Sequence, residues 1–336
     1  MLSRPARRAA ALVTLPVLAL SLAACGDEPE EETAQGFDAV EITGQPGETP
    51  EFSWDANLEA DEAVTEVLSE GDGPVLKKGQ KVLVNVAVSN DWDERVTYDT
   101  FGEDLAASQL EVGAKAEPTV ASDLVVQLVA DQVKADETTV GTRYAVVLES
   151  DKEWADFNVV ELGVGNEDGV AAVVELSSVV RPGPTPAPKT PAAWAPTLEK
   201  GEGGVPTGLD SSGIPKPDVK GEEVRVTTLL EGNGEPVEKG DLAVVDYLGQ
   251  TWGGEEPFDQ SYGEDKEPLA VNVGAGVTGG GINVIDGWSE GLVGVPVGSR
   301  VIIEIPPAKG YGKKGQEPDI KGDDILYFVV DVLGAA

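Results

Sequence analysis

The sequence predicts an α+β fold, in which an antiparallel β-sheet packs around one short helix, and it predicts two copies of this fold. Short apolar or alternating runs separated by Gly, Pro or Asp are typical of antiparallel strands. Helical periodicity is scarce, and the best candidate begins at Asp286, with Trp288 and Leu292 on one face. The same order of strands and turns also occurs in both halves of the chain. Together these observations predict a duplicated α+β domain.

The strand prediction is clearest in the carboxy-terminal third. Each predicted strand carries apolar or alternating residues and is bounded by Gly, Pro or Asp, which interrupt a pleated segment. A single short helix packed on such strands is an α+β arrangement. The predicted strands are residues 224–230, 242–248, 269–273, 300–305 and 325–333.

An internal repeat supports the second copy. Residues 66–88 and 227–249 share a β-run, a Gly-Asp/Asn-Gly turn, a second turn ending in Lys-Gly, and another alternating strand. Further matches follow in the same order, which favours a duplication over chance. They are Tyr98-Asp99 with Phe258-Asp259, Gly102-Glu103-Asp104 with Gly263-Glu264-Asp265, and Val140-Gly141-Thr142-Arg143 with Val297-Gly298-Ser299-Arg300.

Composition excludes several classes of function. The formal net charge is −37, and a surface this negative repels phosphate backbones, so no nucleic-acid partner is expected. The chain has no histidine, which rules out Ser-His-Asp and Cys-His catalysis and His-ligated zinc or haem. The single cysteine rules out intramolecular disulfides and cysteine-rich metal sites. Hydrolysis by paired carboxylates stays open, because acids are abundant.

The amino terminus has the three parts of a secretion signal. Residues 1–24 contain a segment with three arginines, an apolar run that is short for a membrane span, and a small-residue end. The run Leu22-Ala23-Ala24-Cys25 resembles the lipobox of bacterial lipoproteins. That resemblance implies cleavage before Cys25 and lipid attachment to its thiol. We therefore expect an extracytoplasmic protein, lipid-anchored to the bacterial cell membrane, with residues 25–36 as an acidic disordered tether.

Composition also divides the rest of the chain. Residues 181–198 are rich in proline, which predicts an extended, semi-rigid linker. Trp194 within this linker either docks on a neighbour or is exposed. The two expected domains are residues 37–180 and 199–336. No second apolar stretch approaches the length of a membrane span.

Five stretches of the second domain carry a family resemblance. In their order and spacing they resemble successive motifs of the FKBP-type peptidyl-prolyl isomerases. The fold of that family is an antiparallel sheet half-wrapped around a short α-helix, which agrees with the strand prediction. The resemblance implies two FKBP-like domains, the second being the isomerase. The stretches are VVDYLG (244–249), PFDQS (257–261), VIDGWSEGLVGVPVGSR (284–300), IPPAKGYGKKG (305–315) and ILYFVVDVL (325–333).

The resemblance implies an apolar cup that receives the proline ring. Trp288 forms its floor, Asp259 and the Tyr311 hydroxyl are the polar groups at its rim, and the Ile285 N–H donates to a substrate carbonyl. The implied catalytic residues are Tyr247, Phe258, Asp259, Ile285, Trp288, Tyr311 and Phe328, and the implied substrate-binding walls are Leu269, Val284 and Ile320.

Three features depart from the family pattern. Leu269 stands where the family often has an aromatic wall, and Gln316 stands where it often has histidine. The stretch 274–281, just before Val284, is glycine-rich and longer than usual. These departures bear on the rate, the sequence preference and the affinity for macrolide inhibitors, whose binding the resemblance also implies.

Such a cup suits rotation about X–Pro bonds. Amide resonance opposes this rotation with a barrier of roughly 18–20 kcal/mol. No bond is broken, so neither a cofactor nor a metal is expected. The twisted transition state has lost resonance and charge separation, so an apolar pocket stabilises it relative to the planar amide. Proline-containing polypeptides are the expected partners, and folding of exported proteins is the expected role.

The first repeat is expected to have lost this chemistry. In the alignment, Val86 replaces Tyr247 and Trp288 falls near Asp131, while residues 145–158 lack a Tyr-Gly pair like that at Tyr311. Of the site, only the Tyr98-Asp99 pair is retained. We interpret this repeat as a degenerate FKBP-like domain, used as a scaffold or spacer, for dimerisation or for holding a client.

Two other functions are weighed against an isomerase. A proline-segment-binding chaperone or envelope scaffold without turnover is the main alternative, since the cup departs from the family pattern at Leu269 and Gln316. A solute-binding lipoprotein is disfavoured, because such proteins need long helices around a hinged cleft and few helical patterns are present.

Overall fold

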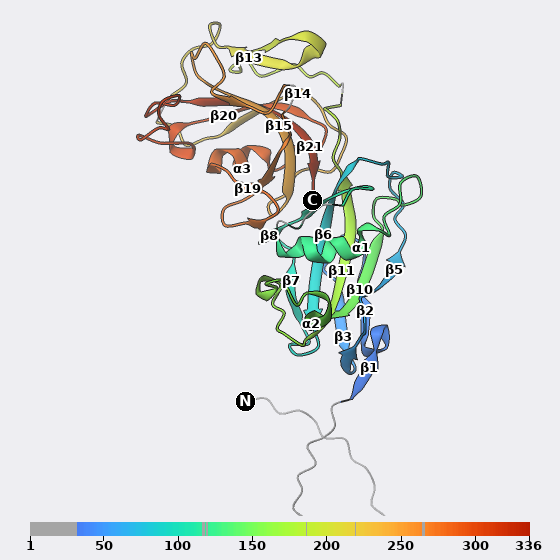
Figure 1. The fold of residues 1–336 in the computed structure, drawn as a ribbon. Coiled ribbons are helices and arrows are strands. Elements are labelled where there is room, and N and C mark those ends of the chain that lie inside the picture. Colours follow the sequence, from blue (N-terminus) through green and yellow to red (C-terminus); the bar gives the residue numbers. More distant parts are fainter. Residues whose placement is uncertain (1–31, 116–117, 119, 186, 219, 264–265) are drawn as a thin grey trace, which may run out of the picture. The chain divides into compact units, whose positions relative to one another are not determined.

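The computed structural model describes residues 32–115, 118, 120–185, 187–218, 220–263 and 266–336. Residues 33–336 form one compact unit, drawn in Figure 1. The predicted secretion signal and Cys25 lie outside the described residues, as do Glu264 and Asp265 of the repeat match.

The first repeat contains a six-stranded sheet in which every strand pair is antiparallel. The strand order is β5-β10-β11-β6-β7, and β9 pairs with the first half of β6. The helix α1 lies across one face of this sheet (Figure 1). The elements are β5 (Val64–Ser69), β6 (Lys81–Asn90), β7 (Val96–Asp99), β8 (Leu105–Ala106), β9 (Ser108–Glu111), α1 (Ala121–Ala130), β10 (Arg143–Glu149), α2 (Ser150–Glu153), η2 (Val160–Leu162) and β11 (Gly169–Val179).

The second repeat contains a seven-stranded sheet with the order β14-β20-β21-β15-β17-β19, and β16 pairs with β15. The pairs are antiparallel except β17 with β19. The helix α3 packs on one face (Figure 1). The elements are β14 (Arg225–Leu230), β15 (Leu242–Thr251), β16 (Asp259–Gln260), β17 (Leu269–Asn272), β18 (Thr278–Gly279), β19 (Ile282–Asn283), α3 (Asp286–Leu292), β20 (Arg300–Ile305), η4 (Pro307–Lys309) and β21 (Leu326–Ala335).

The two sheets share one strand order, because β5-β10-β11-β6-β9 corresponds to β14-β20-β21-β15-β17. The predicted α+β class, with two antiparallel sheets each packed on a short helix, is confirmed. The turns of the repeat also correspond. Gly73 N donates to Val140 O at 3.1 Å, and Gly234 N donates to Val297 O at 3.0 Å.

An upstream segment covers the outer face of each sheet. In the first repeat, Val40 and Leu58 pack against Val147 of β10; in the second, Leu209 packs with Ile302 of β20. Strands β10 and β20 are therefore buried on both faces, which explains their continuous apolar runs. The covering elements are β1 (Thr33–Gln35), η1 (Gly36–Ala39), β2 (Val40–Thr43), β3 (Glu51–Trp54), β4 (Asn57–Glu59), β12 (Thr197–Lys200), η3 (Glu202–Gly204) and β13 (Pro206–Asp210).

The predicted tether over 25–36 extends too far toward the fold. Thr33–Gln35 form β1, which pairs in parallel with Asn57–Glu59 of β4. Ala34 packs against the apolar cluster on the outer face of the first sheet. The last residues of the predicted tether therefore belong to the folded unit, because they close the cover of this sheet.

The predicted spacer over 181–198 packs against the second repeat. Thr185 N donates to Gly298 O at 2.7 Å, and Lys189 N donates to Leu229 O at 2.9 Å. Trp194 is the docking residue, since it joins the outer apolar cluster and lies 4.7 Å from the Arg225 guanidinium. Proline richness alone did not reveal this docking, because the outer face of the sheet supplies the partners.

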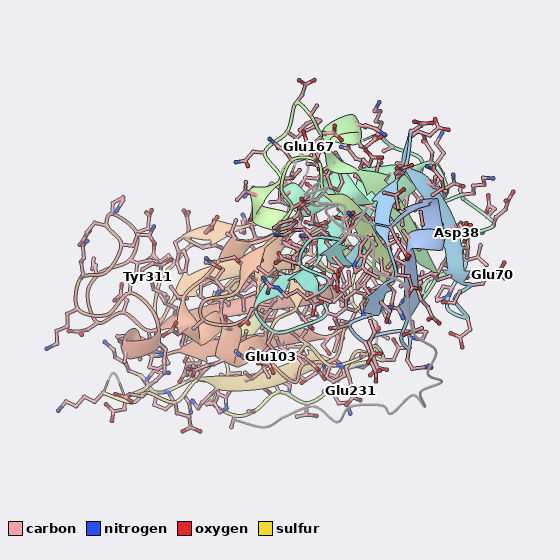
Figure 2. All side chains as sticks on the ribbon, turned by 90° about the horizontal axis from the view of Figure 1, so that it is seen from below. Asp38, Glu70, Glu103, Glu167, Glu231 and Tyr311 are labelled. Atoms are coloured by element: carbon pink, nitrogen blue, oxygen red, sulfur yellow. The ribbon has the colours of Figure 1, made fainter. Side chains whose placement is uncertain are left out.

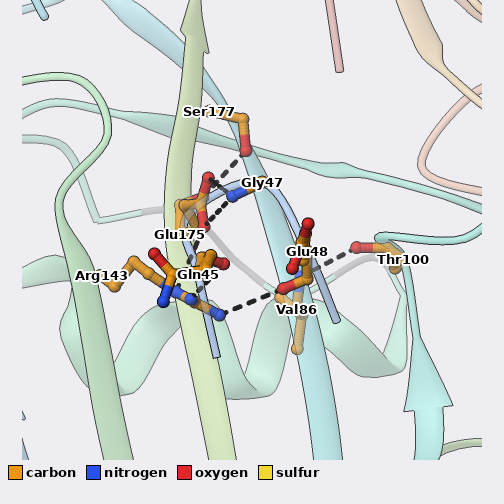
Figure 3. A network of polar contacts seen from close by, with 8 residues as sticks. All are labelled: Gln45, Gly47, Glu48, Val86, Thr100, Arg143, Glu175 and Ser177. Carbon is orange, nitrogen blue, oxygen red and sulfur yellow. Dashed lines mark hydrogen bonds and ion pairs between the residues drawn. The ribbon is translucent and has the colours of Figure 1, made fainter. Parts of the chain in front are cut away.

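Each repeat buries an arginine–acid pair between its equivalent central strands. Arg143 Nε lies 3.2 Å from Glu175 Oε2, and Arg300 Nε lies 2.6 Å from Asp331 Oδ1. The first pair also holds the covering segment, because Gly47 N donates to Glu175 at 3.0 Å (Figure 3). The second pair does the same, because Arg300 Nη1 donates to Gly204 O at 3.4 Å. Each pair thus joins the outer cover to the sheet.

The surface carries the negative charge that composition predicted. Acidic side chains extend into solvent at Asp38, Glu70 and Glu167 of the first repeat and at Glu231 of the second (Figure 2). Among the described residues, no helix has the length and apolar character needed to cross a membrane.

Candidate active site

The helix α3 places Trp288 under the centre of the second sheet. Ile285 is the residue before the first turn, in extended conformation with φ −61° and ψ 149°. Within the helix, Trp288 and Leu292 lie four residues apart and both face the core. The Trp288 side chain is only 3% exposed. The short helix therefore fixes one aromatic plane at the base of the site.

Three further aromatic rings surround Trp288. The Tyr247 ring centroid lies 5.3 Å from that of Trp288 at an interplanar angle of 82°. The Phe328 centroid lies 5.0 Å from Trp288, and Phe258 lies 5.6 Å from Phe328, again edge to face. Edge-to-face pairs are the favoured aromatic packing. The four rings, from β15, the loop before β16, α3 and β21, form what we call the aromatic cluster.

Gly249 makes room for two of these rings. A Cβ at this position would lie 2.6 Å from a Phe328 ring carbon and 2.7 Å from Phe258, closer than side chains tolerate. The first repeat has Val88 at the equivalent place on β6. Gly249 is thus a site determinant that the residue-by-residue comparison missed, although it ends the VVDYLG motif.

The loop after η4 supplies Tyr311 and Ile320. Gly315 N donates to Tyr311 O at 3.1 Å, and Gln316 and Ile320 exchange backbone hydrogen bonds of 2.8 and 3.0 Å. These bonds close the loop on itself. Tyr311 is consequently held half-buried against the aromatic cluster, while Ile320 is 3% exposed.

The polar edge of the cluster is a tyrosine–aspartate pair. Tyr247 Oη donates to Asp259 Oδ2 at 2.5 Å, and Asp259 is exposed. Burial, with the Asp259 hydrogen bond and charge next, raises the pKa of Tyr247 above its ordinary value. Burial and the Asp259 charge also raise the pKa of Tyr311. Both hydroxyls therefore stay protonated at neutral pH and remain donors.

The structure brings the sequence-predicted site residues together. The Ile285 N–H stays open, because it has no hydrogen-bond acceptor among the described residues. All of the apolar members belong to one cluster with the second core, and only Asp259 lies at its exposed rim. The apolar members are Tyr247, Phe258, Leu269, Val284, Ile285, Trp288, Tyr311, Ile320 and Phe328.

The retained Tyr98-Asp99 pair of the first repeat is shifted by one position. Thr100 N donates to Val86 O at 2.9 Å, as Ser261 N does to Tyr247 O. This register places Tyr98, not Asp99, at the position of Asp259. The prediction that Tyr98-Asp99 matches Phe258-Asp259 is therefore wrong. Thr100 follows Val86 by 14 positions, as Ser261 follows Tyr247, so the two connections have equal length and the likeness of the Tyr-Asp and Phe-Asp pairs was out of register.

The first repeat fills its cup with side chains. Tyr98 is 5% exposed and packs in the first core, together with Val86 and Ala172 at the positions of Tyr247 and Phe328. Trp154 follows Arg143 by as many positions as Tyr311 follows Arg300, and it too is buried. Among the described residues of this repeat, the packing leaves no exposed tyrosine–aspartate pair like Tyr247 and Asp259.

The helix of the first repeat also differs from the alignment. Asp131, the residue aligned near Trp288, follows the last turn of α1 and is exposed. The helix buries Leu124, Val125, Val126 and Val129 instead. The aromatic floor is replaced by aliphatic side chains rather than by an acid, because α1 is longer than α3.

A separate pocket of about 420 Å³ lies beside α1 and is lined by the first repeat and by Gly280 of the second. Leu124, Leu128, Trp154 and Phe157 contribute to its apolar lining, with Glu153 among its acidic residues. Its described lining residues include no tyrosine–aspartate pair. The aromatic cluster of the second repeat is therefore the better candidate for a prolyl site.

The fold and the cluster together define a prolyl isomerase domain, and comparison with known proteins agrees. Residues 233–333 match the family model described as FKBP-type peptidyl-prolyl cis-trans isomerase. FK506-binding protein 1A of Aspergillus fumigatus is 35% identical over 112 residues, which are 32% of this chain and 93% of that protein. FK506-binding protein 2 of the same species is 38% identical over 110 residues, 33% of this chain and 75% of that protein.

Parts of the chain also resemble solved structures, at low TM-scores. The structure of FkpA from Escherichia coli is 32% identical with a TM-score of 0.29, covering 36% of this chain and 50% of that one. The three FKBP domains of wheat FKBP73 cover 82% of this chain and 95% of that one, at 17% identity and a TM-score of 0.31. On the sequence matches, the chain belongs to the FKBP-type peptidyl-prolyl cis-trans isomerases. It is an enzyme that acts on X–Pro bonds.

Proposed function

We propose that this isomerase is a lipid-anchored foldase that acts on newly exported proteins, with the aromatic cluster of the second repeat as its prolyl site. The proposed anchor is Cys25, within the lipobox-like run at the end of an apolar leader. Uncatalysed X–Pro isomerisation takes tens to hundreds of seconds. An enzyme tethered where polypeptides emerge meets its clients before they aggregate.

The observation that carries the site assignment is the aromatic cluster with a polar edge. Trp288 offers a flat apolar surface for the proline ring, and Leu269, Val284 and Ile320 border it. The Ile285 N–H and the Tyr311 hydroxyl are donors for the carbonyls that flank the proline. A titrating base or a nucleophile is not required, since the reaction only rotates a bond.

The proposed mechanism is differential stabilisation of the twisted amide. Twisting removes resonance, so the carbonyl loses charge separation and gains from an apolar, water-poor contact. Donors already fixed by the fold hold the flanking carbonyls without reorganisation. Lowering the barrier by about 4 kcal/mol corresponds to roughly a thousandfold acceleration.

The site is tested by the same Asp→Asn change in each of the two repeats. Asp259→Asn keeps the shape of the rim but removes its charge, and Asp99→Asn makes the same change in the first repeat. We expect Asp259→Asn to lower kcat/KM for a prolyl peptide about tenfold and Asp99→Asn to leave it unchanged. The assay uses residues 33–336, the compact unit. Equal activity of the two variants would count against the site.

The anchor is tested separately in cells. We expect the full chain to incorporate a labelled fatty acid and to remain with the membrane fraction. Cys25→Ser is expected to lose the label and to appear in the soluble fraction. Label on Cys25→Ser, or an unlabelled parent chain, would contradict a lipid on the Cys25 thiol.

A further inference from the structure

The glycine-rich loop before Val284 contacts the first repeat. Thr278–Gly279 form β18, which pairs in parallel with Leu105–Ala106 of β8. Thr278 N also donates to Asp104 O at 3.1 Å. A loop of the catalytic repeat thus extends a small sheet onto the other repeat.

Two glycines permit this close backbone approach. A Cβ on Gly279, whose φ is +132°, would lie 2.6 Å from Ala106 O, and a Cβ on Gly280 would lie 2.5 Å from Ala107 O. Both carbonyls belong to the backbone and cannot swing away as a side chain does. The glycine richness of residues 274–281 is therefore explained in part by contact with the first repeat.

Apolar burial and ion pairs surround the contact. Leu83 and Ala107 of the first repeat share one buried cluster with Leu242 and Val277 of the second. Two ion pairs lie at its edge, Lys239 with Glu103 at 2.6 Å and Lys81 with Glu267 at 3.0 Å. Exposed ion pairs contribute little each, so the buried cluster carries most of the attraction.

The far end of the loop is fixed by Asn272. Gly281 N donates to Asn272 Oδ1 at 2.9 Å, and Asn272 Nδ2 donates to Gly281 O at 3.0 Å. The chain then forms β19, which pairs with β17, and continues directly into Val284 and Ile285. The segment that reaches the site is consequently held at β18 by the first repeat and at Gly281 by the second.

We propose that the first repeat is a positioning unit for the prolyl site. Strand β8 fixes the glycine-rich loop, and the loop fixes Val284 and the open N–H of Ile285. A spacer would not affect the site. Here, loss of the contact between β8 and β18 lets Val284 and Ile285 move, although no residue of the site itself has changed. The inference rests on the assignment of Val284 and Ile285 to the prolyl site.

The test compares two glycines of one loop in residues 33–336. Gly280→Ala drives a methyl group into Ala107 O, whereas the Cβ of Gly276→Ala meets nothing within 4 Å. Gly276 has φ +83°, whereas Gly280 has no left-handed φ. The control therefore shows what backbone strain in this loop does without the clash. We expect Gly280→Ala to raise KM for a prolyl peptide about fivefold with kcat within twofold, and Gly276→Ala to change KM less than twofold.

Hydrogen exchange reports whether the contact itself has opened. The Thr278 amide is expected to exchange faster in Gly280→Ala than in the parent and in Gly276→Ala. If the Thr278 amide exchanges faster in Gly280→Ala but KM is unchanged, the first repeat does not position the site. If exchange of this amide is unchanged, the contact between β8 and β18 does not hold the loop. Asp259→Asn separates this proposal from the assignment of the prolyl site. If Asp259→Asn loses activity while Gly280→Ala keeps a normal KM, the site assignment stands and only the positioning role is contradicted.

A charge swap gives a second route that leaves the loop untouched. Glu103→Lys places two cations together at the contact, and Lys239→Glu added to it restores an opposite-charge pair. We expect the single change to raise KM about twofold at low salt and the double change to return it to the parent value. The same KM for the single and double variants would contradict the role of this contact.

Discussion

At the scale of single residues, the absence of a side chain at Gly249 matters as much as the aromatic rings do. Its Cα faces Phe258 and Phe328 so closely that even a methyl group requires both rings to move. We expect Gly249→Ala to lower kcat/KM about tenfold and to destabilise the fold by about 1–3 kcal/mol. The measurements are peptide isomerisation and urea unfolding of residues 33–336.

Val88 supplies the control for Gly249, because it occupies the equivalent position in the first repeat. Val88→Ala removes volume from a packed core and is expected to cost stability while leaving kcat/KM unchanged. Full activity of Gly249→Ala would show that the ring positions do not limit catalysis.

Asp241 makes folding stability depend on pH. Burial raises its pKa to about 6; the hydrogen bond from Glu238 N opposes this shift, and the Glu238 charge adds to it. Since the folded pKa exceeds the ordinary value of 3.8, the folded state binds the proton more tightly. Protonation of Asp241 therefore stabilises the folded state below about pH 4, and this contribution to the free energy of unfolding is lost as the pH rises through about 6.

Asp241→Asn keeps an oxygen acceptor for Glu238 and removes the titrating charge. We expect this variant to be more stable than the parent by about 1 kcal/mol at pH 7 and equally stable at pH 4. Urea unfolding at the two pH values measures the difference. An equal gain at both pH values would mean that packing, not the charge, is responsible.

At the scale of elements, the buried arginine–acid pairs join neighbouring strands to their outer covers. Arg300 donates two hydrogen bonds to Asp331, at 2.6 and 2.7 Å. Asp331→Asn leaves a buried cation without its counter-charge, so we expect a loss of about 3 kcal/mol in the free energy of unfolding. Arg300→Met combined with Asp331→Leu removes both charges and is expected to recover part of it. Equal stability of the parent and Asp331→Asn would contradict this account.

The five predicted strands and the helix of the second repeat follow from sequence because their patterns are local, whereas the short strands β16, β18 and β19 were not predicted. Period-two strands and a short helix with Trp288 and Leu292 on one face are visible without tertiary information. The pairing partners of Tyr98 and Asp99 are not visible in this way, so the likeness of Tyr98-Asp99 to Phe258-Asp259 placed both residues one position out of register. The docking of Trp194 was also hidden, because it depends on an outer sheet face assembled from distant strands.

The apolar residues that the family resemblance implied lie in one cluster, whereas the contacts that support this cluster were not predicted. Gly249 and the contact between β8 and β18 act through close approach of backbone to side chain or backbone. In the sequence, such a contact is marked only by a glycine, and a glycine alone does not identify the group that packs against it.

At the scale of the whole molecule, the net charge of −37 favours positively charged clients. An acidic surface raises the local concentration of basic polypeptides and repels acidic ones, and salt screens both effects. We expect kcat/KM for a lysine-flanked prolyl peptide to exceed that for a glutamate-flanked one by about tenfold at low salt. The ratio is expected to fall toward one at high salt, and a salt-independent ratio would assign the preference to local contacts.

The central claim is that the aromatic cluster of the second repeat accelerates X–Pro isomerisation. The most direct measurement is the refolding rate of a proline-limited test protein with catalytic amounts of residues 33–336, Trp288→Leu or Trp92→Leu. Trp92 is 82% exposed in the first repeat, so it controls for loss of a tryptophan. The account predicts acceleration by the parent and by Trp92→Leu, and at least about tenfold less by Trp288→Leu. Undiminished acceleration by a folded Trp288→Leu would contradict it.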